Sequence, residues 1–211
     1  TWKSPATRRS VISIVNAAFN RAEEMFGVVN PIKGLKKPKE NPRLASLSPE
    51  EEQALYDICE PCFSNFLFAA IHTGLRPFSE LARLTAEDIE EHDRGMMWRV
   101  YASKTDKTRK IPVRPEIAKL TRQLIKTAPK GSGKPIFRNT RGNPWKRMNG
   151  VLRFIGLKKK LKWNNDPVKG KYSCYTCRHT FVHRMLSGYW TDGRGASIET
   201  VAELIGDTPT T

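Results

Sequence analysis

The spacing of apolar residues predicts an amphipathic helix near the start of the chain. From Thr7 to about Phe26, apolar side chains recur every three to four positions, and Gly27 then ends the pattern. Such a period places the apolar side chains on one face of a helix. The stretch from Asn30 to Pro49 is different, because it carries four prolines among several lysines. It predicts a connecting segment without regular structure.

A second group of helices is predicted from Ser48 onward. Ser48 is followed by Pro at the first helical position and Glu at the third, the residues of a capping box. This helix is expected to run to about Glu60, and a more apolar helix to follow as far as Gly74. A further helix is expected to carry Glu80 and Leu81.

Between Asp88 and Val113 the period changes to two, which is typical of strands. Trp98 and Val100 alternate with more polar neighbours such as Arg99, and turns are expected at 93–95 and 104–107. Helical patterns return over 115–127, 145–162, 172–188 and 197–205. The chain is therefore predicted to be mainly α with a small antiparallel β-sheet, an α+β fold.

Charge indicates the class of partner. The 211 residues carry a formal net charge of +16 and a pI near 9.9, an imbalance that attracts polyanions. Nucleic acid is the favoured partner and an acidic membrane surface the lesser alternative. We see neither an apolar run near the roughly 20 residues of a spanning helix nor a secretory signal. We therefore expect a cytoplasmic, nucleoid-associated protein that has no membrane partner.

Two C-x-x-C pairs, Cys59/Cys62 and Cys174/Cys177, raise the question of a zinc site. The pairs of a zinc ribbon are separated by about 15–20 residues, and these are separated by far more. Each pair also falls in a predicted helix. We therefore expect reduced thiols, no metal and no cofactor.

Three basic residues at the edges of predicted elements suit a phosphodiester. Arg76 ends the segment Thr-Gly-Leu-Arg, Lys104 lies in Ser-Lys-Thr, and Arg178 lies in Tyr-Thr-Cys-Arg-His-Thr-Phe. Arginine can hold two oxygens of a phosphate at once, and lysine can supply charge or a proton.

These segments, with Glu-Leu-Ile-Gly-Asp near the end, resemble the catalytic domain of the tyrosine recombinase (phage integrase) family. The resemblance runs from about Leu47 to the end, and the leading helix resembles the tail of the family's helical core-binding domain. It implies three parts: the end of a core-binding domain (1–30), a basic interdomain linker (31–47) and a catalytic domain (48–211). The linker would be either a solvated connector or a strap along a DNA backbone.

The resemblance also implies a reaction. A tyrosine hydroxyl attacks one DNA strand and forms a 3′-phosphotyrosine, without metal or ATP. Arg76 and Arg178 would hold the non-bridging oxygens, and Lys104 would protonate the leaving 5′-oxygen.

Departures from the family pattern concern three positions. Glu80 lies four residues after Arg76 instead of three, and we expect it still to orient that arginine. Tyr175 occupies a position usually held by His, and Asp207 one usually held by His or Trp, so both are retained as catalytic candidates. Because a carboxylate repels phosphate, Asp207 is expected to point elsewhere or to pair with an arginine. On the helical face of Tyr175, His179 and His183 could compensate, although packed histidines are commoner, and His179 is kept as a supporting residue.

Counting onward from Asp207 places the nucleophilic tyrosine just beyond Thr211. We therefore expect a chain truncated before its nucleophile, which binds double-stranded DNA without cutting it. The resemblance implies a homotetramer on DNA for the intact protein, a monomer for this fragment, and leaves room for accessory DNA-bending proteins. The alternatives are a catalytically inactive DNA-binding relative and, with little support, a metal-dependent nuclease.

The remaining candidates are basic residues expected to contact DNA phosphates. They lie in the linker (Lys36, Lys37, Lys39, Arg43), in the hairpin (Lys107, Arg109) and at a turn before a helix (Arg141, Lys146, Arg147). For the lysine-rich run 158–162, a solvated helix end and a DNA-facing patch are equally compatible with the sequence.

Overall fold

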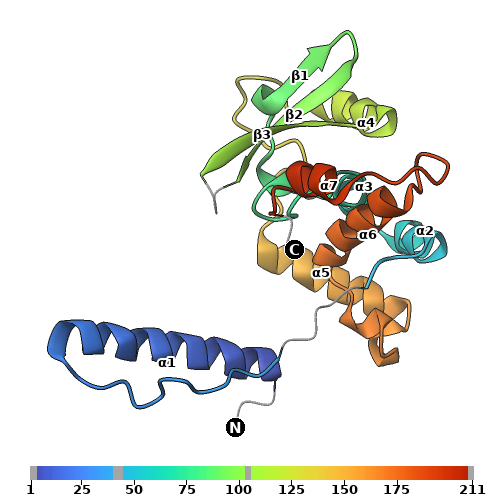
Figure 1. The fold of residues 1–211 in the computed structure, drawn as a ribbon. Helices are drawn as coiled ribbons and strands as arrows, with labels where there is room; N and C mark the ends of the chain where they lie inside the picture. Colours follow the sequence, from blue (N-terminus) through green and yellow to red (C-terminus); the bar gives the residue numbers. More distant parts are fainter. Residues whose placement is uncertain (1–3, 40–44, 103–105, 209–211) are drawn as a thin grey trace. The chain divides into compact units, whose positions relative to one another are not determined.

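A computed structural model of the chain describes residues 4–39, 45–102 and 106–208 (Figure 1). Its backbone divides into two units, Thr1–Leu44 and Ala45–Thr211, which are described one at a time.

The first unit is built on helix α1 (Pro5–Phe26), which Gly27 ends in the left-handed conformation at φ 67°. The segment that follows returns along the helix (Figure 1). The Asn30 amide donates hydrogen bonds to the side-chain oxygens of Asn16 (3.0 Å) and Asn20 (2.6 Å), and Arg9 donates to the Pro38 carbonyl at 3.2 Å. Asn30 and Pro38 are therefore bonded to α1, within the stretch for which the sequence predicted a connecting segment without regular structure. None of the α1 residues is buried.

The second unit begins with α2 (Pro49–Ile58) and α3 (Pro61–Thr73). Ser48 forms the predicted capping box, accepting from the Glu51 N–H while the Glu51 carboxylate accepts from the Ser48 N–H. The prediction that α2 reaches Glu60 was wrong by two residues, because Pro61 opens a new helix. Cys59 consequently caps α2 and does not lie within a helix, contrary to the prediction.

Three antiparallel strands form the sheet in the order β1 (Ile89–His92), β2 (Gly95–Ala102) and β3 (Lys107–Pro112). Trp98 pairs with Ile89 on one side and Ile111 on the other. The predicted alternation of β2 is confirmed, since every second residue from Met96 is buried.

Helices α4 (Pro115–Ile125), α5 (Arg147–Lys160), α6 (Cys174–Ser187) and α7 (Ile198–Ile205) complete the unit. Two short 3-10 segments, Leu81–Arg83 and Ala86–Asp88, lie between α3 and β1, and two more, Trp163–Asn165 and Lys169–Lys171, lie between α5 and α6. The prediction of a longer helix at Glu80 was wrong. There the backbone N–H groups of Glu80 and Leu81 both donate to the Arg76 carbonyl, which makes a turn, and the Glu80 side chain bonds back to the Arg76 N–H.

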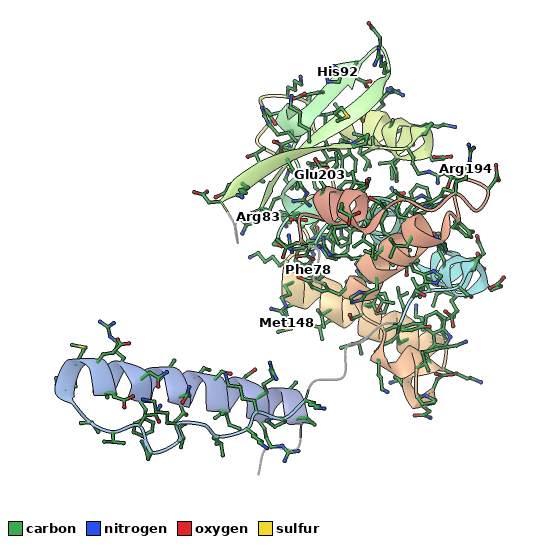
Figure 2. All side chains as sticks on the ribbon, in the orientation of Figure 1. Phe78, Arg83, His92, Met148, Arg194 and Glu203 are labelled. Atoms are coloured by element: carbon green, nitrogen blue, oxygen red, sulfur yellow. The ribbon has the colours of Figure 1, made fainter. Side chains whose placement is uncertain are left out.

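Helix α3 forms the centre of the core. Phe63, Phe66, Leu67 and Ile71 are almost fully buried, and α3 packs against α6, with the sheet at one end of the unit (Figure 1). Phe78 points toward α5 (Figure 2), where its ring packs on Gly150. The predicted fold class, mainly α with a small antiparallel sheet, is confirmed. None of the helices in the described part of the chain could span a membrane.

Candidate active site

The end of α3 turns sharply at Gly74, and this turn positions Arg76. Gly74 has φ 64°, and its N–H donates to the Ala70 carbonyl. The Phe181 ring packs directly on its Cα, so that a Cβ would lie well inside van der Waals contact. The turn thus requires glycine both for its backbone conformation and for its packing.

Glu80 holds Arg76 in place from the protein interior. Arg76 Nη1 donates to Glu80 Oε1 at 2.7 Å, and the Arg76 N–H donates to Oε2 at 2.8 Å. This is the contact expected from the sequence despite the extra residue between them. Burial alone would raise the pKa of Glu80, but hydrogen bonds from Arg109 and Arg76 outweigh it and hold the pKa below its ordinary value of 4.5. Glu80 is therefore an ionised carboxylate at neutral pH.

Arg178 reaches the same place from α6. Its Nη1 donates to the carbonyl oxygens of Gly74 (2.8 Å) and Ile205 (2.9 Å), while Nη2 donates to Asp207 Oδ2 at 2.7 Å. Burial and the neighbouring Arg76 lower the pKa of Arg178, and Asp207 opposes that shift. A guanidinium nevertheless remains charged at neutral pH.

Asp207 joins the two arginines. Its Oδ1 accepts from Arg76 Nη2 at 3.0 Å and its Oδ2 from Arg178 Nη2 at 2.7 Å. Of the two arrangements that the sequence left open, the structure has the paired one, with both arginines. Two guanidiniums from distant parts of the chain are thus spaced to bind the two oxygens of one oxyanion.

Arg109 is a member of this cluster that sequence reasoning placed elsewhere. It was predicted to contact DNA, but its Nη1 and Nη2 donate to Glu80 Oε1 and Oε2, each at 3.1 Å, and its Nε donates to the Leu204 carbonyl at 3.0 Å. Its position two residues before buried Ile111, on the same strand face, was the signal that could have identified it. Glu80 is therefore bound between two guanidiniums.

Lys104 lies outside the described residues, and so does Arg43. The strands on either side of Lys104 pair Ala102 with Lys107.

Among the described residues, no hydrogen bond or ion pair joins Tyr175, His179 or His183 to the two arginines. Tyr175, His179 and His183 lie on an exposed face of α6, whereas Arg178 on the same helix is buried. Partial burial and the charge of Arg178 lower the pKa of His179 below 6.5. Its imidazole is therefore neutral at neutral pH.

The other predicted DNA contacts are exposed lysines and arginines, apart from Arg43. In the first unit they are Lys36, Lys37 and Lys39; in the second they are Lys107, Arg141, Lys146 and Arg147. The lysine-rich run divides: Lys158 is buried and donates to the Gly170 carbonyl at 2.6 Å, while Lys159, Lys160 and Lys162 are exposed.

The four cysteines are free thiols. Burial raises the pKa of Cys174 to about 12, and burial together with Glu60 raises that of Cys59 to about 12. Within the described ranges, no group of three or more His, Cys, Asp or Glu residues is placed to hold a metal ion.

The sequence itself matches a known family: residues 45–206 fit the model of the "Phage integrase family". No curated protein sequence matches the chain.

Solved structures of DNA-bound integrases share the fold. The Tn1549 transposon integrase in complex with circular intermediate DNA has a TM-score of 0.71 and 18% identity, covering 98% of this chain and 72% of that one. A lambda integrase (75–356) dimer bound to a COC′ core site has a TM-score of 0.72 and 16% identity, covering 97% and 73%. A lambda integrase tetramer bound to a Holliday junction has a TM-score of 0.72 and 16% identity, covering 98% and 60%.

Proposed function

The chain belongs to the phage integrase family, and on that premise we propose that it is the site-specific recombinase of a mobile element, which breaks and rejoins DNA through a 3′-phosphotyrosine intermediate. The observation that carries this proposal is the pair Arg76 and Arg178, whose guanidiniums converge on the two oxygens of one carboxylate. A phosphodiester presents its two non-bridging oxygens in the same bidentate way.

In this proposal the arginine pair stabilises the charge that builds on the phosphate oxygens as the nucleophile attacks. Preorganised charge of this kind is usually the largest contribution to catalysis. Both guanidiniums are preorganised, Arg76 by Glu80 and Arg178 by the carbonyls of Gly74 and Ile205. Neither has to be ordered when substrate arrives.

The other chemical steps are assigned by the family resemblance. Lys104 on the hairpin would protonate the leaving 5′-oxygen, and a tyrosine would be the nucleophile. The phosphotyrosine conserves the energy of the broken bond, so that a second DNA end can reverse the step without ATP.

The same proposal assigns the parts of the chain. Residues 1–30 would be the end of a core-binding domain, 31–47 a basic linker and 48–211 the catalytic domain. The exposed cations Lys36, Lys37, Lys39, Lys107, Arg141, Lys146 and Arg147 would bind the backbone of double-stranded DNA. Lambda integrase is dimeric on a core site and tetrameric on a Holliday junction, which supports a tetramer of the intact protein on DNA.

Covalent trapping tests the proposal. The intact gene product is incubated with supercoiled plasmid carrying the ends of its element, in EDTA, and protein-linked DNA is precipitated after denaturation. We expect a covalent adduct that survives EDTA and that Arg178→Ala reduces at least about a hundredfold, the scale of losing a charge-stabilising donor. Arg138→Ala, which removes a half-buried arginine that donates to Thr127, should leave the adduct unchanged.

A catalytically inactive DNA-binding relative is the second candidate. It is favoured by Asp207, whose single carboxylate binds both arginines, and by Tyr175, which stands where the family usually has His. DNA binding by the intact protein without any covalent adduct would establish this candidate and reject the recombinase.

A further inference from the structure

Asp207 covers the arginine pair from the solvent side. The side chains of Arg76 and Arg178 are 16% and 7% exposed, while that of Asp207 is 53% exposed. Glu80, which is 2% exposed, binds Arg76 from the opposite, interior side. The accessible face of the pair is therefore occupied by one carboxylate, with one oxygen on each guanidinium.

The backbone of Asp207 is held independently of its side chain. The chain leaves α7 through Gly206 in the left-handed conformation, and the Asp207 N–H donates to the Ala202 carbonyl at 2.9 Å. Gly206 in turn packs against Arg109, whose Nη1 would lie 2.7 Å from an added Cβ. A change of the Asp207 rotamer would thus break its bonds to Arg76 Nη2 and Arg178 Nη2 while α7 stays folded. Arg76 Nη2 would keep its bond to the Gly206 carbonyl (3.1 Å), and Arg178 Nη1 its bonds to the Gly74 and Ile205 carbonyls.

Glu80 cannot replace Asp207 in this role. Its two oxygens already accept from the Arg76 backbone and from both terminal nitrogens of Arg109. Three guanidiniums, those of Arg76, Arg109 and Arg178, face two carboxylates in this cluster, which leaves one positive charge in excess. Removing the negative charge of Asp207 would increase this excess on the side that faces solvent.

We propose that the Asp207 carboxylate competes with phosphate for the arginine pair. It occupies the place where the two arginines bind phosphodiester oxygens, and it must move away before they can bind DNA. This inference rests on the proposed function. It makes the Asp207 side chain a determinant of how tightly the site binds an oxyanion. When DNA binds, the two arginines would exchange their hydrogen bonds to the Asp207 carboxylate for hydrogen bonds to the phosphate.

The test is a titration of the chain with inorganic phosphate at low ionic strength. Binding is measured by calorimetry and by the NMR signals of the arginine Nε–H groups. Asp207→Asn keeps the shape and removes the charge, so we expect phosphate affinity to rise about tenfold or more, the scale of one charge-assisted hydrogen bond. Asp207→Ala should act in the same direction. Thermal melting checks that both variants fold.

Glu203→Gln is the matched control. Glu203 lies on α7 one turn before Asp207, is exposed, and is labelled in Figure 2. The substitution removes the same charge from the same end of the chain without touching the arginines. Phosphate affinity of Glu203→Gln is expected to rise by about twofold at most, because solvent screens the effect of an exposed charge on the site. Equal effects of Glu203→Gln and Asp207→Asn would overturn the proposal.

Arg178→Lys separates failure of this inference from failure of the proposed function. Lysine keeps the charge and loses the bidentate grip. If Arg178→Lys weakens phosphate binding while Asp207→Asn changes nothing, Asp207 is no competitor and the arginine site stands. The second comparison adds Arg178→Lys to the Asp207→Asn variant. If the double variant binds phosphate as tightly as Asp207→Asn alone, phosphate binds elsewhere and the proposed role of the arginine pair fails as well.

Discussion

Glu80 is the residue on which the candidate site depends at the smallest scale. It is buried, ionised and bonded to two arginines from different elements. Burying a charge is costly unless it is paired, and removing one partner from a buried pair leaves the other uncompensated. The acid is therefore expected to matter for the stability of the fold as well as for the orientation of Arg76.

Glu80→Gln should lower the free energy of unfolding by about 2–3 kcal/mol, because it leaves two partly buried guanidiniums without their counter-charge. Urea unfolding of the second unit measures it. The control is Glu90→Gln, which removes the partner of Lys110 in an exposed pair on the sheet and should cost less than about 1 kcal/mol. Equal losses in the two variants would contradict a special role for Glu80.

Acid should weaken the fold through the same carboxylate. The pKa of Glu80 lies below 4.5, as does that of Glu52, where hydrogen bonds from His72, Tyr56 and Arg184 outweigh burial. A depressed folded-state pKa contributes stability that is fully present above 4.5 and is lost as pH falls through the folded value. The free energy of unfolding should therefore fall below pH 4.5, and Glu80→Gln should flatten that fall. An unchanged slope in the variant would contradict the prediction.

At the scale of elements, the turn after α3 and the end of α7 together hold Arg178 in position. The carbonyls of Gly74 and Ile205, one at each of these helix ends, accept from the same nitrogen of Arg178. Helix ends leave carbonyl groups without intrahelical partners. Arg178 satisfies two of them and thereby joins α3, α6 and α7.

Gly74→Ala should destabilise the second unit by about 2–4 kcal/mol, since it adds a strained left-handed backbone to a clash with Phe181. Gly142→Ala is the control: its φ of 74° is equally left-handed, but nothing lies within 4 Å of the added Cβ. It should cost only about 1–2 kcal/mol. Thermal unfolding of both variants compares them, and equal costs would show that Phe181 yields to the added methyl group.

At the scale of the whole molecule, we expect net charge to govern the proposed binding of DNA. Lysine and arginine number 37 against 21 acids, and part of this excess is neutralised internally, as at Arg76, Arg109 and Arg178. The exposed remainder is distributed over both units. Each cation that binds a phosphate releases a counterion from DNA.

Affinity for duplex DNA should fall steeply with salt. If about six to ten phosphates are bound, it should fall roughly a thousandfold or more between about 50 and 200 mM salt. Fluorescence anisotropy at several salt concentrations gives the slope. Replacing Arg141, Lys146 and Arg147 together by alanine should reduce the slope by about 0.9 for each phosphate that these side chains neutralise. A slope near zero would exclude a binding mode based on phosphate neutralisation.

The local signals of the sequence were sufficient for most elements. The capping box at Ser48, the period of two around Trp98 and the glycine at position 74 each act within a few residues, so that they could be read from the chain alone. Arg76, Arg178 and Glu80 were identified by their segments and do meet in space. The predicted roles of Lys104 and Tyr175 remain predictions.

Only the tertiary structure decided which charges meet. The turn after α3 carries Arg76 and Glu80, and it is far in sequence from β3, α6 and the residues after α7. Contacts among these segments decide whether Arg109 faces DNA or Glu80, and whether Asp207 turns away or spans two arginines. The cost of burying a charge is set by those distant partners and not by neighbours along the chain. The sequence by itself determined the elements and the inventory of charges, and packing determined how those charges pair.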